Sequence, residues 1–142
     1  MPLSGSAEDT LSIVQQAFQC VAARDTDGLL ALVADDVAWL PPDRVGHLSW
    51  GGRFSGRAEV ARWIDAVKEA LEELVLVPHD FLVADDTVVV LGRETARVRA
   101  TGAGYDTDFA HVIRVRDGRI ISFRGFHDTA AVLAAAGAGK RG

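Results

Sequence analysis

Apolar and polar residues alternate along much of the C-terminal half of the chain. Residues 87–100, 105–116 and 119–127 are runs rich in Val, Ile, Phe and Thr, and turns that contain glycine separate them. Runs of this kind predict three antiparallel strands in a meander. Because side chains of a strand point alternately to its two faces, the pattern also predicts a sheet with one dry face and one wet face.

The first turn, residues 101–104, fixes the register of the first two strands. Whether two or all four of its residues form the loop, Ala100 pairs with Tyr105. This register places Glu94 directly opposite His111, so that the two side chains lie within reach of each other.

The second turn, residues 116–118, decides which face of the last strand is buried, because a one-residue change in loop length exchanges the two faces. A two-residue loop at Asp117 and Gly118 would turn Ser122 and Arg124 to the dry face. A three-residue loop with Gly118 in the left-handed region aligns a less polar set with that face, at a lower cost of burial. We therefore expect the three-residue loop. The buried set is then Ile121, Phe123, Gly125 and His127.

Three titratable residues, Glu94, His111 and His127, fall on the predicted dry face. The first two strands contribute to that face Val88, Val90, Gly92, Glu94, Ala96, Val98, Thr107, Phe109, His111, Ile113 and Val115. The wet face carries Arg93, Thr95, Arg97, Arg99, Asp106, Asp108, Arg114, Ser122 and Arg124. One buried Glu or His is usually a hydrogen-bonded structural residue. Three of them on one apolar face favour a buried acid–base site, because burial and a neighbouring charge move a pKa toward neutral pH.

The N-terminal half is expected to form three amphipathic helices. Ser6 starts the first with Asp9, and Ser55 caps the third. Apolar positions at helical spacing are Leu11, Val14, Phe18 and Val21, then Leu29, Leu30, Leu32 and Val33, then Val60, Trp63, Ile64, Val67 and Leu71. Further strands are expected at 37–40 and 74–84, with a helical turn at 129–133. The order predicts an α+β fold, in which the three N-terminal helices pack on a strongly curved antiparallel or mixed sheet.

Composition excludes several classes of function. The 142 residues carry a net charge of −5 with no basic run, which argues against a nucleic-acid or anionic-membrane surface. No signal peptide or membrane-spanning run is apparent, so a cytoplasmic protein is expected. Cys20 is the single cysteine, which excludes an internal disulfide and a cysteine cluster for zinc. We expect one domain over 1–142, with flexible tails at 1–5 and 137–142.

Four segments resemble a known family. Residues 24–37 (RDTDGLLALVADDV), 54–57 (FSGR), 109–120 (FAHVIRVRDGRI) and 127–131 (HDTAA) are similar to the SnoaL-like branch of the nuclear transport factor 2-like superfamily. The resemblance covers nearly the whole chain. It implies the cystatin-like α+β barrel with a cone-shaped pocket, usually in a homodimer, and no metal or organic cofactor.

The catalytic sets of this superfamily are incomplete in the chain. Ketosteroid isomerases place an Asp before a Pro at the end of the first strand, where Leu40 stands here. The Asp-Arg-Asp set of the epoxide hydrolases falls on Glu94, Gly92 and Gly125. Polyketide cyclases pair a His with an Asp, and here His111 matches while Gly125 replaces the Asp. The two glycines are expected to leave space for a ligand.

The leading hypothesis is a SnoaL-like enzyme of natural-product biosynthesis that transfers a proton on an apolar, polyketide-like or polycyclic carbonyl compound, by isomerisation, cyclisation or dehydration. His111 would be the general base or acid, Glu94 its orienting partner, and His127 a second donor to a substrate oxygen. The expected substrate-binding residues are Trp39, Trp50, Phe109, Phe123, Phe18 and Trp63.

Two alternatives remain open on the sequence. The same pocket could bind a hydrophobic small molecule without turnover, or it could be vestigial in a dimeric scaffold or interaction module. His47 and Trp50 lie in the loop between Pro42 and Ser55, and a loop tryptophan often contributes to binding. We expect a homodimer through the convex sheet face, which carries Arg93, Thr95, Arg97, Val112, Ile120 and Phe126.

Overall fold

The computed structural model describes residues 5–42 and 48–137. His47 and most of the two expected flexible tails lie outside these residues. The elements in chain order are α1 (Gly5–Ala23), α2 (Thr26–Ala31), β1 (Val33–Leu40), β2 (Phe54–Ser55), α3 (Arg57–Ala70), β3 (Leu71–Ala84), β4 (Thr87–Val98), β5 (Gly104–Arg116), β6 (Arg119–His127) and α4 (Thr129–Ala135).

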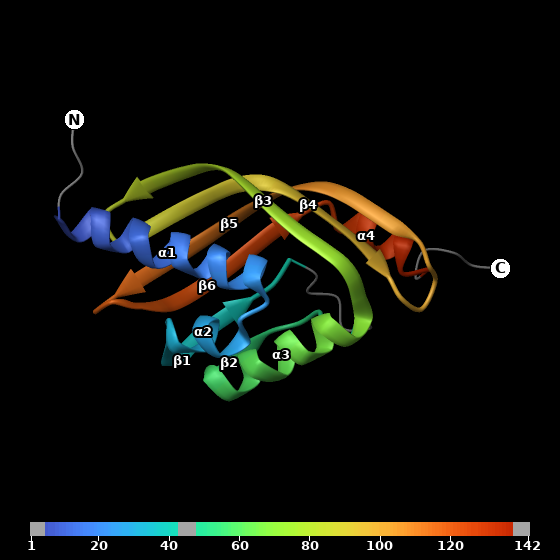
Figure 1. Ribbon diagram of the computed structural model, residues 1–142, viewed down its shortest axis with the longest axis horizontal. Helices are drawn as coiled ribbons and strands as arrows, with labels where there is room; N and C mark the ends of the chain where they lie inside the picture. The colour runs from blue at the N-terminus through green and yellow to red at the C-terminus, as the bar shows by residue number, and fades with distance from the viewer. Residues whose placement is uncertain (1–4, 43–47, 138–142) are drawn as a thin grey trace.

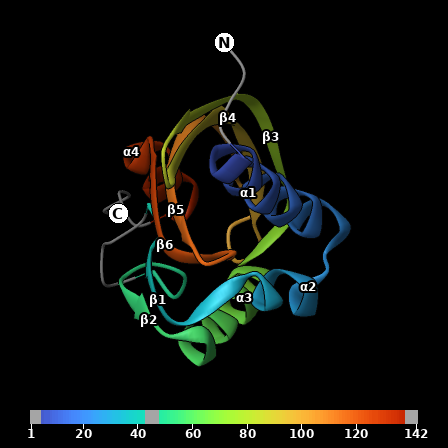
Figure 2. The same cartoon turned by 90° about the vertical axis from the view of Figure 1, so that its left-hand side faces the viewer.

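One mixed sheet, in the order β2-β1-β6-β5-β4-β3, forms the body of the molecule. β1 and β6 run parallel, and the other neighbouring strands are antiparallel. Figure 1 shows the long strands lying side by side, and Figure 2 shows the sheet arching over α1 while α2 and α3 lie on its open side. The predicted α+β class is confirmed. α4 is a fourth helix, where the sequence predicts only a turn.

The concave face of the sheet is buried as the alternation predicts. Val88, Val90, Phe109, Ile113 and Phe123 are each at most 6% exposed. They pack with one side of each N-terminal helix, including Val14 of α1, Leu29 of α2 and Val60 of α3. Transfer of these apolar surfaces from water is the main favourable contribution to folding.

The start of α3 differs from the prediction. Ser55 pairs with Ala38 of β1 and belongs to the short edge strand β2, so it cannot cap the helix. Gly56 occupies the N-cap position without a side-chain hydrogen bond, and its φ of 84° lies in the region that favours glycine. The Glu59 carboxylate instead accepts the backbone N–H of Ser55 at 2.8 Å.

The register between β4 and β5 also differs from the prediction. Glu94 lies opposite Thr107, and His111 lies opposite Val90. The predicted pairing of Glu94 with His111 is therefore wrong by four residues. Because four is an even number, both side chains still point to the concave face.

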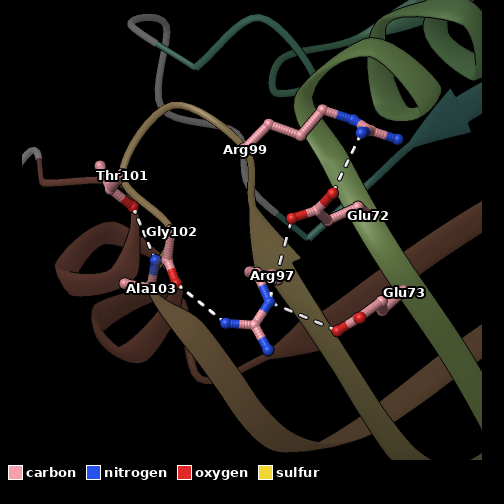
Figure 3. Close-up of polar contacts among 7 residues, drawn as sticks. All are labelled: Glu72, Glu73, Arg97, Arg99, Thr101, Gly102 and Ala103. Atoms are coloured by element: carbon pink, nitrogen blue, oxygen red, sulfur yellow. Dashed lines mark hydrogen bonds and ion pairs between the residues drawn. The ribbon is translucent and has the colours of Figure 1, made fainter.

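A wide turn at residues 99–103 causes this shift (Figure 3). Ala100, which is expected to pair with Tyr105, lies in the turn instead. The Arg97 guanidinium donates to the carbonyl of Gly102 at 3.2 Å and to the carboxylate of Glu73 at 3.3 Å. These bonds tie the turn to the ends of β4 and β3.

The turn between β5 and β6 has two residues, so the expected three-residue loop is wrong. Arg116 pairs with Arg119, and Asp117 and Gly118 have φ angles of 52° and 75°. Positive φ at both central residues is the requirement of a type I′ turn, which matches the twist of the strands it joins.

A bulge next to this turn restores the buried face of β6. Ile120 pairs with Val115 and Phe123 lies opposite Ile113, so Ile121 is an extra residue in β6. Ile120 is 1% exposed and Ile121 is half-buried, contrary to the expectation that Ile121 is buried and Ile120 lies on the convex face. Phe123 and the residues beyond it have the predicted orientation.

Two further irregularities bend β3. Its register to β4 shifts between Glu72 and Val75 and again between Pro78 and Asp80. A bulge increases the local bend and twist of a strand. His79, whose side the sequence leaves undetermined, is the extra residue of the second bulge and is exposed.

The two glycines that are expected to leave space for a ligand do not leave it. A Cβ atom on Gly92 would collide with the carbonyl of Val77 and lie 2.6 Å from Cζ of Phe109. A Cβ atom on Gly125 would lie 2.8 Å from the ring of Pro42. Both positions are glycine because neighbouring atoms already fill the space.

We predict that Gly92→Ala lowers the free energy of unfolding by about 1–3 kcal/mol, because the added methyl group forces the Val77 carbonyl or the Phe109 ring to move. Gly104→Ala is the matched control, since its Cβ atom would lie 3.5 Å from the Ala96 carbonyl, an ordinary contact. Urea unfolding measures both variants. Equal stability of the two variants would contradict the packing described for Gly92.

Candidate functional site

A cavity of about 140 Å³ lies between the concave face of the sheet and the three N-terminal helices. Four of the expected substrate-binding residues line it: Phe18, Trp39, Trp63 and Phe123. His111 is the imidazole in its wall. The rest of the interior lining is almost entirely apolar, with side chains such as Ile64, Leu76 and Ile113.

Trp50 and Phe109 do not line this cavity. Trp50 is buried in a second core cluster with Leu71 and Val98, and its carbonyl accepts the indole N–H of Trp63 at 2.9 Å. Phe109 packs on His111, with ring centroids 4.3 Å apart. The two residues thus support the wall of the cavity and do not form it.

Three aromatic rings surround the imidazole of His111. Phe18 stacks on it at 5.8 Å between centroids, Phe109 lies at 4.3 Å, and Phe123 meets it edge-on at 4.8 Å. Neither ring nitrogen has a hydrogen-bond partner among residues 5–42 and 48–137. A buried polar group without a partner costs about 1–3 kcal/mol, so an unbonded imidazole beside a cavity calls for a functional explanation.

Burial and, to a smaller extent, the nearby His127 together lower the pKa of His111 to about 3. Transfer of a charged imidazolium into an apolar site is unfavourable, which is the physical cause of the larger effect. His111 is therefore neutral at neutral pH. A neutral imidazole offers one N–H donor and one nitrogen acceptor to a ligand.

Glu94 and His127 lie outside the cavity lining and belong to another buried cluster. The Tyr105 hydroxyl donates a hydrogen bond to Oε2 of Glu94 at 2.6 Å, and Nδ1 of His127 lies 3.7 Å from the same oxygen. Next to them, the Thr107 hydroxyl accepts the backbone N–H of Asp128 at 3.0 Å. The three predicted catalytic residues are thus divided, with His111 at the cavity and the other two beside Tyr105.

Tyr105 is not among the site residues predicted from the sequence. Its alternation with Thr107 and Phe109 places it on the dry face, so the pattern contains this signal. The incorrect register places His111 beside Glu94, where the structure has the hydroxyl of Tyr105.

Exposed polar residues form the mouth of the cavity. Arg24 and Asp25 follow α1, and Lys68 lies in the last turn of α3. Asp25 caps α2 by accepting the backbone N–H of Gly28 at 2.8 Å, and the Lys68 ammonium donates to the Thr26 hydroxyl at 2.5 Å. The site thus has an apolar interior and a charged opening.

Cys20 also lines the cavity. Partial burial and, secondarily, the negative charge of Asp25 raise the pKa of its thiol. A raised pKa leaves little thiolate at neutral pH, so Cys20 is a poor nucleophile. Its position nevertheless makes it a useful chemical reporter for occupation of the cavity.

Two other kinds of site find no support within the described ranges. Residues 5–42 and 48–137 hold no group of three or more His, Cys, Asp or Glu side chains arranged for a metal ion. None of the helices in the same ranges is long and apolar enough to cross a bilayer.

The chain belongs to the SnoaL-like domain family, whose model matches residues 14–123. This confirms the resemblance noted in the sequence. No curated protein matches the chain in sequence.

Solved structures share the fold. An NTF2-like protein of unknown function from Burkholderia pseudomallei is 30% identical, with 89% of this chain and 96% of that chain aligned and a TM-score of 0.83. TerC, co-crystallized with polyporic acid, is 26% identical over 89% of this chain and 97% of that chain, with a TM-score of 0.81. An LEH-like epoxide hydrolase from M. tuberculosis is 16% identical over 91% and 90%, with a TM-score of 0.72, and this likeness shows the fold alone.

We predict that His111 makes the stability of the protein fall on mild acidification. The unfolded chain binds a proton at this residue below about pH 6.5, whereas the folded protein does not do so until its lowered pKa, about 3, is reached. Because the unfolded state binds more protons in this window, the free energy of unfolding decreases as the pH falls.

The His111→Leu variant lacks this contribution. Between about pH 7 and about pH 5, wild type should lose on the order of 2 kcal/mol relative to the variant, as measured by urea unfolding at each pH. His79→Leu, which removes an exposed histidine, is the control. Parallel stability curves for wild type and His111→Leu would show that His111 is not held neutral by burial.

Proposed function

We propose that the protein binds an apolar, ring-containing carbonyl compound in the cavity and transfers a proton on it with His111. The observation that carries the proposal is a neutral imidazole without a hydrogen-bond partner among the described residues, in the wall of an otherwise apolar cavity. A ligand oxygen supplies the missing partner. The surrounding rings of Phe18, Trp39 and Phe123 favour a flat apolar ligand.

The size of the cavity limits the part of the ligand that it encloses. About 140 Å³ is close to the roughly 150 Å³ of an engineered apolar cavity that stays dry and binds benzene. One ring with a short substituent therefore fits without rearrangement. A polycyclic substrate would extend toward the charged mouth or displace part of the helical cover.

The chemistry at His111 follows from its neutrality. The ring nitrogen removes a proton from the carbon next to the substrate carbonyl, which breaks the C–H bond and leaves an enolate beside an imidazolium. The two opposite charges stabilise each other in the apolar cavity, where Coulomb interactions are strong. Return of the proton to a different atom completes an isomerisation, and its return to the same atom gives exchange.

The comparisons support a small-molecule ligand. TerC, of which 97% is covered by the alignment, was co-crystallized with polyporic acid. The cavity also argues against a vestigial pocket, since Phe123 packs on Trp39 and Trp63 at its edge without closing it.

Binding without turnover is the second candidate function. The observation that favours it is the position of Glu94, whose carboxylate is bonded to Tyr105 and does not orient His111. A base with a pKa of about 3 is also weaker than the value near the working pH at which acid–base catalysis is most efficient.

Acetophenone and ethylbenzene form a matched pair of probes for the role of His111, since only acetophenone carries a carbonyl. We predict that His111→Leu weakens acetophenone binding about tenfold through loss of a hydrogen bond, and leaves ethylbenzene binding unchanged within about twofold. Calorimetric titration gives the affinities, and slower modification of Cys20 by a thiol reagent locates each probe in the cavity. An equal loss of affinity for both probes in His111→Leu would contradict a hydrogen bond from His111 to the ligand.

Exchange of the acetophenone methyl protons in deuterium oxide distinguishes an enzyme from a binding protein. Catalysis predicts exchange on the order of a hundredfold faster with wild type than with His111→Leu, and no change with the exposed control His79→Leu. Exchange at the same rate in wild type and His111→Leu, with acetophenone bound, would establish binding without proton transfer.

We also propose a homodimer through the convex face of the sheet, with a second copy of the chain as the partner. Leu91, Ala110 and Phe126 form one row across β4, β5 and β6, and Leu91 and Phe126 are 38% and 41% exposed. Ile120, which is expected in this interface, is excluded from it by its burial. Arg93 already pairs with Asp106 and Asp108 in its own chain, so apolar contact is the main driving force.

Sedimentation equilibrium tests the dimer. We predict a dimer at tens of micromolar, and a shift toward monomer in Leu91→Asp/Phe126→Asp, which buries charge in the proposed interface. Asp36→Asn on the exposed surface of β1 is a control for altered charge. A wild-type monomer at these concentrations would contradict the interface.

A further inference from the structure

Two cationic side chains at the mouth of the cavity have no carboxylate partner in the described part of the chain. Arg24 and Lys68 both line the cavity and are both exposed. Neither forms an ion pair with any residue in 5–42 or 48–137. By contrast, Arg93, Arg97 and Arg114 on the convex sheet face each pair with an Asp or Glu at 3.3 Å or less.

Asp25 is the carboxylate at the same mouth, and it keeps its negative charge while it caps α2. Asp25 turns toward α2, where its Oδ1 accepts the backbone N–H of Gly28 at 2.8 Å. Lys68 donates to the neutral Thr26 hydroxyl, which positions its ammonium without compensating its charge. In a protein with a net charge of −5, the two positive side chains outnumber the single carboxylate, Asp25, among the described residues that line this cavity.

We infer that the ligand of this cavity is amphipathic, with an apolar ring inside and an anionic group, such as a carboxylate, held at the mouth by Arg24 and Lys68. This inference rests on the proposed function, since it assumes that the cavity binds a small molecule. An anion at the mouth keeps much of its hydration, while the two cations stabilise it by charge-assisted hydrogen bonds. His111 then meets the other end of the ligand.

The geometry also orients the ligand. The interior offers apolar contacts, the neutral imidazole of His111 and the indole of Trp39, whose buried Nε1 has no partner among the described residues. It offers no positive charge, so burial of a carboxylate there would be strongly unfavourable. At the mouth the same group meets positive charge and solvent. An aromatic or alkyl-aromatic acid therefore enters ring first, and Arg24 and Lys68 select it over neutral compounds of the same shape.

The probes 4-ethylbenzoate and 4-ethylbenzamide test this selectivity, because they have nearly the same shape and differ in charge. Calorimetric titration should show that wild type binds the benzoate on the order of fivefold to tenfold more tightly than the amide at about 50 mM salt. The preference should shrink at about 300 mM salt, as expected for a partly exposed ionic contact.

Variants test whether Arg24 and Lys68 cause the preference for the benzoate. In Arg24→Gln/Lys68→Gln the ratio of the two affinities should approach one, while the affinity for the amide stays unchanged. Lys68→Arg alone should retain the preference. Arg62→Gln, which removes an exposed arginine of α3 that does not line the cavity, is the control and should retain it as well. Thermal unfolding verifies that each variant is folded.

The outcomes separate this inference from the proposed function. Protection of Cys20 by both probes with equal affinities in wild type overturns the anionic ligand and leaves the cavity as a binding site. A preference for the benzoate that survives in the double variant assigns selectivity to other residues and also overturns the inference. If neither probe binds or protects Cys20, the proposed function fails and the inference fails with it.

Discussion

Burial of the concave face of the sheet is the interaction on which the other features of the molecule depend. β4, β5 and β6 present Val90, Phe109 and Phe123 to the helices, and a change of one residue in register would turn polar or charged residues such as Arg93, Asp108 and Arg124 to this face. The type I′ turn at Asp117 and Gly118 alone would produce that change in β6. The bulge at Ile121 reverses it, so the chain combines a favourable turn with an apolar interior.

Burial of polar groups on this side of the sheet costs free energy, and the chain deals with this cost in two ways. Glu94 is bonded to the Tyr105 hydroxyl and lies near His127, so its burial is compensated by a partner of its own protein. His111 is instead held neutral among aromatic rings with no such partner among the described residues. The first arrangement stabilises a structure by itself, whereas the second becomes favourable only when another molecule supplies the hydrogen bond. This difference favours His111 over Glu94 as the centre of the proposed site.

The sequence predicts faces better than registers, and the reason is physical. Hydrophobic alternation identifies Glu94, His111 and Phe123 as inward side chains, because a period of two is sensitive to odd shifts only. A shift by four residues leaves the pattern unchanged, so the turn at 99–103, closed by Arg97, has no signature in the alternation. Of the six residues predicted to contact the ligand, Phe18, Trp39, Trp63 and Phe123 line the cavity, whereas Trp50 and Phe109 do not. The separation of Glu94 from His111 could not be predicted, because it depends on that turn.

The cavity and the imidazole of His111 in its wall both lower the stability of the folded protein. Side chains that line the cavity of about 140 Å³ lack packing partners on one side, which forfeits part of their dispersion energy. The imidazole of His111 in its wall also lacks a hydrogen bond from the described residues. A leucine at position 111 and a larger residue at Ala17, which also lines the cavity, would recover part of both. Elsewhere the described core is tightly packed, as the collisions around Gly92 and Gly125 show. Buried side-chain nitrogens without a hydrogen bond among the described residues also occur at Trp39 and Arg57, and of these two residues Trp39 lines the same cavity as His111. Exceptions to local consistency are expected at functional sites, which favours this cavity as the proposed site.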